Sequence, residues 1–113
     1  MSKVNENIRK FRIFRRLSQK QLGQQLSKSA NVISNWETGI HSPDLDTIQD
    51  ICRILKINPN ELFGWEENRE YLEFKRKMEQ YQMQIENLQK QKQAIEKEID
   101  SLEKKSKEFS SDD

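Results

Sequence analysis

The 22 residues from Ser18 to Gly39, SQKQLGQQLSKSANVISNWETG, decide the fold of this chain. Ser18 precedes an apolar-periodic run and Gln21 follows three residues later, which is the capping box that starts a helix. Ser29 is a good N-cap for a second helix, which we expect to end before Gly39. The stretch therefore predicts two short helices joined by a tight turn.

The first of these helices carries a glycine inside its apolar stripe. Leu22 and Leu26 lie one helical turn apart and define that stripe. Gly23 between them costs roughly 1 kcal/mol relative to Ala in a helix interior, so another segment must approach its backbone closely. The second helix, crossing the first, is the expected neighbour.

The second helix has two different faces. Ile33 and Trp36 are three residues apart and are expected on the buried face. Short polar side chains, which are poor helix formers, occupy the other face: Asn31, Ser34 and Asn35. Because one Asn side chain can bond adenine N6 and N7 together, this face is suited to reading base edges in DNA.

Residues 5–64 resemble the helix-turn-helix domain of the Cro and phage-repressor (Xre) family. The positions that keep the family spacing are Ser18, Gln19, Leu22, Ile33, Ser34, Trp36, Glu37, Gly39, Pro43, Leu45 and Ile48. The resemblance implies an all-α fold, a repressor-like bundle of five helices that binds operator DNA.

The resemblance also implies contacts with the DNA backbone. Gln19 would hold a phosphate at the start of the first helix of the motif, Ser29 would meet the backbone, and Thr38 would donate to a phosphate. The turn departs from the family, because Ser27-Lys28 replaces the usual Gly and apolar residue. A non-Gly residue in a left-handed turn costs of order 1 kcal/mol. In this chain we expect Lys28 to reach a phosphate.

Base contacts and one ion pair follow from the same resemblance. Asn31 and Asn35 would face bases, and Ala30 would offer only apolar contact to a thymine methyl group. The family pairs an Arg of the first helix with the Glu before the Gly, which maps to Arg12 and Glu37. We expect this structural ion pair to be largely buried.

A second departure lies in the first helix, which we expect over residues 5–16. Ile13 and Phe14 stand where the family usually has charged residues. We expect these two side chains to pack on the segment after Gly64.

A further helix is predicted over residues 45–55. Its inward-pointing side chains are expected to be Leu45, Ile48, Ile51, Cys52 and Leu55.

Charge is unevenly distributed along the chain, although its net value is only +1. Residues 1–28 carry eight Lys or Arg and one Glu, whereas residues 29–66 carry two basic and six acidic residues. The positive field is thus confined to the first two helices, and a phosphate backbone is its expected partner. The alternative is a basic face that is merely solvated.

The composition argues against catalysis and against membrane insertion. One His, one Cys and no clustered carboxylates in an apolar setting do not supply a triad, a metal site or an acid/base pair. No glycine-rich phosphate loop is present, and no apolar run approaches ~20 residues. We therefore expect no enzymatic activity, cofactor, metal, small-molecule substrate or membrane association. Cys52 is interpreted as a buried structural thiol in a reducing cytoplasm.

The chain after Gly64 contains neither Gly nor Pro, which predicts one long helix. Apolar side chains recur there at alternating spacings of three and four residues, the pattern of a coiled coil. The predicted dimerisation seam consists of Tyr71, Phe74, Met78, Tyr81, Ile85, Leu88, Lys92, Ile95, Ile99 and Leu102. We expect a DNA-binding domain over residues 1–64, a coiled-coil helix over 65–109 and a frayed tail over 110–113.

The flanking charges leave the orientation of the paired helices open. Ile at a positions and Leu at d positions favour a parallel dimer. In a parallel homodimer Glu70 would meet Lys75 of the second copy, but Glu98 would meet Glu103, which is repulsive. An antiparallel pair and a different partner helix both remain open.

Together these features predict a cytoplasmic, sequence-specific transcriptional regulator. It would be a repressor that binds an inverted-repeat operator in double-stranded DNA as a coiled-coil homodimer. The alternative is a protein-interaction module, such as an antitoxin or an anti-repressor target, whose coiled coil binds another protein and for which DNA binding is secondary. Formation of a homodimer by the purified chain discriminates between the two.

Overall fold

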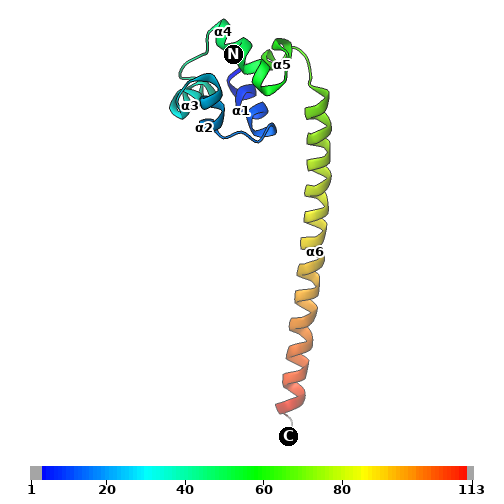
Figure 1. Cartoon of the computed structure of the whole chain (residues 1–113). Coiled ribbons are helices and arrows are strands. Elements are labelled where there is room, and N and C mark those ends of the chain that lie inside the picture. Colours follow the sequence, from blue (N-terminus) through cyan, green and yellow to red (C-terminus); the bar gives the residue numbers. More distant parts are fainter. Residues whose placement is uncertain (1–3, 112–113) are drawn as a thin grey trace. The chain divides into compact units, whose positions relative to one another are not determined.

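The computed structural model describes residues 4–111, and every regular element in that range is a helix. The helices are α1 (Val4–Phe14), α2 (Gln19–Leu26), α3 (Ala30–Thr38), α4 (Leu45–Leu55), α5 (Pro59–Phe63) and α6 (Arg69–Ser111) (Figure 1). The predicted all-α class, with five short helices followed by one long helix, is confirmed. α1 ends two residues earlier than expected, and Arg16 adopts a left-handed backbone with φ of 60°.

The chain divides into two compact units, Met1–Glu73 and Phe74–Asp113. The first unit includes the first turn of α6, so it extends beyond the boundary expected at residue 64. α6 continues through Ser111 and so includes two residues that we expected in the tail; residues 112–113 lie outside the described range. None of the helices described is both long and apolar enough to span a membrane.

Capping boxes set the starts of α2, as the sequence predicts, and of α5. The Ser18 hydroxyl oxygen accepts a hydrogen bond from the backbone N–H of Gln21 at 2.9 Å, and Gln21 Oε1 accepts from the backbone N–H of Ser18 at 2.8 Å. Asn58 and Glu61 form the same reciprocal pair at the start of α5. Each box satisfies two backbone donors that a helix start would otherwise leave unpaired.

The core of the first unit draws on all five short helices. Its almost fully buried side chains are Ile8, Phe11, Leu22, Ile33, Ile51, Leu55 and Leu62. Cys52 is also buried, and burial, followed by the charge of Glu61, raises the pKa of its thiol. The prediction that Leu45 points inward is wrong, because this residue is 75% exposed. As the first residue of α4, Leu45 tilts toward the N-terminal end of the helix, past the packed face.

The turn between α2 and α3 explains the glycine inside α2. A Cβ atom on Gly23 would lie 2.5 Å from the carbonyl oxygen of Lys28 and 3.3 Å from the carbonyl carbon of Ser29. The close neighbour of Gly23 is thus the backbone that leads into α3. We expected the second helix itself in that place. Ser27 stands where the resemblance implies Gly, and it adopts the left-handed conformation with φ of 56°. The chain therefore accepts a cost of order 1 kcal/mol at this turn.

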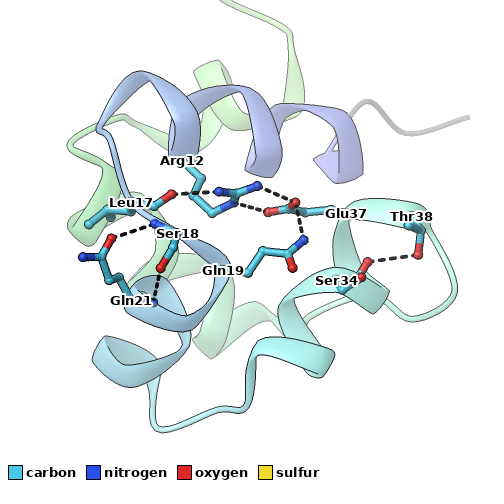
Figure 2. A network of polar contacts seen from close by, with 8 residues as sticks. All are labelled: Arg12, Leu17, Ser18, Gln19, Gln21, Ser34, Glu37 and Thr38. Atoms are coloured by element: carbon cyan, nitrogen blue, oxygen red, sulfur yellow. Dashed lines mark hydrogen bonds and ion pairs between the residues drawn. The ribbon is translucent and has the colours of Figure 1, made fainter.

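A buried ion pair joins α1 to α3. Arg12 Nε donates to Glu37 Oε2 at 2.6 Å, and Arg12 Nη2 donates to Glu37 Oε1 at 3.0 Å (Figure 2). The two side chains are only 11% and 3% exposed. Arg12 Nη1 also donates to the carbonyl oxygen of Leu17 at 2.7 Å, in the turn before α2. One guanidinium thus holds α1, the entry to α2 and the end of α3 together.

The first turn of α6 packs against α1. The Tyr71 ring lies edge to face with Phe11 and with Phe14, at centroid separations of 5.6 and 5.5 Å. The expectation that Phe14 packs on the segment after Gly64 is therefore confirmed. The same expectation is wrong for Ile13, which is 53% exposed.

Arg15 fastens this turn of α6 to the end of α4. Its Nε donates to the carbonyl oxygen of Leu55 at 2.7 Å, and its Nη1 and Nη2 donate to the two carboxylate oxygens of Glu70 at 2.8 and 3.1 Å. The hydrogen bond from Arg15 is the main reason that the pKa of Glu70 is lowered. Tyr71 and Glu70 are thus occupied within the first unit. The expectations that Tyr71 opens the dimerisation seam and that Glu70 meets a partner chain stay predictions, beside these contacts within the first unit.

The part of α6 beyond Glu73 carries a long apolar stripe. Between 39% and 62% of the surface is exposed at each of its members, Phe74, Met78, Tyr81, Ile85, Leu88, Ile95, Ile99 and Leu102. Lys92 interrupts the stripe, and its Nζ lies 3.9 Å from Glu96 Oε1, one turn further on. An exposed stripe with this alternating spacing fits a coiled-coil strand.

Replacing Arg12 with Ala should destabilise the first unit by several kcal/mol, about 3 to 5, because the buried carboxylate of Glu37 would lose its cation. Urea unfolding, followed by the fluorescence of the buried Trp36 in a Trp65→Phe background, measures the free energy of unfolding.

The matched control is Arg53→Ala, which removes an exposed ion pair between Arg53 and Asp50. It should change the free energy of unfolding by less than about 0.5 kcal/mol. Equal stabilities of the Arg12→Ala and Arg53→Ala proteins would contradict the role given to the buried pair.

Phe14→Ser should remove the hydrogen-exchange protection of the backbone amides of residues 71–73, because Tyr71 loses one of its two aromatic neighbours. Exchange measured by mass spectrometry gives the protection of each segment. Ile13→Ser changes an exposed neighbouring residue and should leave this protection intact. Unchanged protection in both variants would show that Phe14 does not anchor α6.

Candidate nucleic-acid interface

α3 is held rigidly at both ends and along one face. The Ser29 hydroxyl oxygen accepts from the backbone N–H of Val32 at 3.3 Å, and Gly39 ends the helix in the left-handed conformation, with φ of 83°. Ile33 and Trp36 are buried. The helix therefore presents a fixed outer face.

The outer face of α3 gathers the polar residues that the sequence predicts as base readers. Asn31 is exposed, and Ser34, Asn35 and Ala30 are half-buried. Asn31 and Asn35 are four residues apart and so lie on the same side of the helix, one turn apart. Their amides offer both donors and acceptors, which is the chemistry needed to recognise base edges.

Thr38, at the end of α3, uses its hydroxyl within the helix. Thr38 Oγ1 donates to the carbonyl oxygen of Ser34 at 3.0 Å (Figure 2). It also lies 3.4 Å from the carbonyl oxygen of Asn35. A hydroxyl has a single hydrogen to donate. The expected bond from Thr38 to a phosphate therefore requires this hydroxyl to rotate away from the helix.

Two of the predicted phosphate-contacting residues lie outside α3. Gln19 is the first residue of α2, and Lys28 is exposed in the turn between α2 and α3, which pack against each other. The pKa of Asp44 is lowered, chiefly by hydrogen bonds from Thr47 and to a smaller extent by the charge of Lys28. The positive charge of Lys28 therefore also acts on Asp44, the N-cap of α4.

One contact at this site was not predicted from the sequence. Gln19 Nε2 donates to Glu37 Oε1 at 3.1 Å, so Gln19 joins the ion pair of Arg12 and Glu37 (Figure 2). Gln19 and Glu37 are 18 positions apart and on different helices, and no local pattern links them. Two apolar residues that follow α3 in the sequence were also not predicted to be exposed, Ile40 at 65% and Leu45, the first residue of α4, at 75%.

The comparisons with known proteins concern the first unit above all. Residues 8–62 match the helix-turn-helix family model HTH_3. The HTH-type transcriptional activator BcrR of Enterococcus faecalis is 33% identical over 63 residues, which is 56% of this chain. The chain covers only 31% of the length of that relative.

Two solved structures are similar to the chain. One is the P22 c2 repressor protein in complex with a synthetic operator, with 25% identity and a TM-score of 0.52, over 56% of this chain and 96% of the repressor chain. The other is Bacillus thuringiensis PlcR in complex with the peptide PapR7 and DNA, with 26% identity and a TM-score of 0.51, over 74% of this chain and 29% of PlcR. The chain therefore carries, over residues 8–62, a helix-turn-helix domain of the Cro and phage-repressor (Xre) type.

Proposed function

We propose that this protein is a DNA-binding transcriptional regulator that recognises an inverted-repeat operator as a dimer and represses by occupying it. The observation that carries the proposal is the polar face of α3, with Asn31 and Asn35 one turn apart, opposite the buried Ile33 and Trp36. The similarity to a repressor and to PlcR in complexes with DNA supports it. Such a regulator acts where the DNA is, in the cytoplasm of a bacterial cell.

Base recognition falls to α3 in this proposal. Asn31 and Asn35 make hydrogen bonds to base edges in the major groove, and Ser34 lies between them in the sequence as a further polar contact. Ala30 meets a thymine methyl group. An amide that bonds an adenine at two points discriminates against another base by about 1 to 3 kcal/mol.

Phosphate contacts position α3 in the groove. They come from Gln19 at the start of α2, Lys28 and Ser29 in the turn, and Thr38 once its hydroxyl has rotated. These contacts carry no sequence information, but they set the register and the angle of the reading helix. The basic N-terminal segment adds a sequence-independent attraction that weakens as salt rises.

Dimerisation is assigned to the apolar stripe of α6, from Phe74 to Leu102. One small domain makes few base contacts, so joining two domains raises affinity through effective concentration. Recognition helices of a dimer enter successive major grooves about 34 Å apart. Parallel pairing keeps both domains at one end of the coil. Antiparallel pairing would separate them by the length of the coil, roughly 60 Å.

Selection of the full-length protein on random duplex DNA, followed by sequencing, tests the proposed recognition. We expect enrichment of an inverted repeat whose half-sites lie about one helical turn apart. The variant carrying both Asn31→Ala and Asn35→Ala should lose this enrichment while keeping weak, salt-sensitive binding. Enrichment of one sequence by both proteins would overturn the role of α3. No enrichment by either would favour the protein-interaction module.

Charges placed in the stripe test the dimer. The double variant Ile85→Glu and Ile99→Glu should convert the protein to a monomer in light scattering, and its affinity for the selected DNA should fall by about 100-fold or more.

The matched control places the same charges on exposed apolar residues outside the stripe, Met83→Glu and Ala94→Glu. This control should remain a dimer with wild-type affinity. A monomeric wild-type protein that binds the inverted repeat tightly would contradict the role of α6.

A further inference from the structure

The carboxylate of Glu37 accepts three hydrogen bonds from two helices. Arg12 supplies two of them, and Gln19 Nε2 supplies the third at 3.1 Å (Figure 2). The Glu37 side chain is 3% exposed, whereas Gln19 is only half-buried. One end of the Gln19 amide is therefore fixed against a buried charge, while the residue itself still reaches the surface.

The charge of Glu37 also decides which way the Gln19 amide faces. An ionised carboxylate offers only acceptors, so Gln19 must turn its NH₂ group toward Glu37 and its oxygen away. The NH₂ group has two hydrogens and Glu37 Oε1 takes one of them. The second N–H keeps a direction set by the buried carboxylate.

We propose that Glu37 is a positioning residue for DNA binding, which holds the Gln19 amide so that its second N–H donates to a DNA phosphate. The inference rests on the proposed function and deepens it. A free Gln side chain loses much rotamer freedom when it forms a contact, and a side chain already held in place has less freedom to lose. Since Glu37 belongs to α3 and Gln19 to α2, the same bond sets the phosphate contact relative to the reading helix.

The first arm of the test observes Gln19 in the free protein by NMR. Its side-chain amide signals, assigned with a Gln19→Met variant, should show one proton shifted downfield with a small temperature coefficient. Addition of the 30-base-pair duplex that the wild-type protein enriches should shift the second proton in the same way. The exposed Gln24 provides the reference. Signals of Gln19 that match those of Gln24 in the free protein would overturn the inference.

The second arm is a double-mutant cycle on DNA affinity. Gln19→Ala should weaken binding of the same duplex by about tenfold in the wild-type background, as expected for a hydrogen bond to a charged group. In a Glu37→Gln background the amide of Gln19 is no longer oriented by a charge. In that background Gln19→Ala should weaken DNA binding by less than about threefold. Non-additivity of this kind is the signature of coupled residues.

Asn31→Ala controls for damage to the interface as a whole. Its cost in affinity should be the same in the wild-type and Glu37→Gln backgrounds, because its side chain is on the base-reading face. An equal loss of affinity on Gln19→Ala in both backgrounds would overturn the inference about Glu37. The proposed function in DNA binding would still stand. If Glu37→Gln does not fold, the NMR arm on the wild-type protein decides. Absence of any binding by the wild-type protein would overturn the proposed function, and the inference with it.

Discussion

The buried charge of Glu37 is the constraint on which the DNA-binding domain depends. A carboxylate that is only 3% exposed must be matched by a cation and hydrogen-bond donors, since leaving it unpaired would cost several kcal/mol. Its donors come from Arg12 on α1 and Gln19 on α2, while Glu37 itself belongs to α3. Satisfying one charge therefore fixes three helices relative to one another. That arrangement leaves the polar face of α3 outward.

The features that the sequence predicts well are those set by local chemistry. Capping residues such as Ser18 and Ser29 act on backbone groups within one turn, and they place helix starts where the structure has them. Gly23 signals a close backbone approach, because only a missing Cβ explains a glycine inside a helix. The left-handed turn at Ser27 follows from the family resemblance and brings the strain that the missing Gly implies.

The features that the sequence does not predict depend on contacts between distant segments. Tyr71 keeps the spacing of the coiled-coil seam, yet it packs on Phe11 and Phe14, because periodicity does not say which surface will cover a side chain. Leu45 has the right spacing for the core but lies at the first turn of α4, outside the packed face. The hydrogen bond between Gln19 and Glu37 depends on how α2 and α3 cross, which no short pattern encodes.

Dimethyl sulfate footprinting on the selected duplex tests most directly that α3 reads DNA from the major groove. The reagent methylates guanine N7 in the major groove and adenine N3 in the minor groove. We predict that the protein protects guanine N7 in two clusters about one helical turn apart, on one face of the duplex, and leaves adenine N3 between them reactive. Protection of adenine N3 in the half-sites, with guanine N7 in the same half-sites left fully reactive, would contradict it.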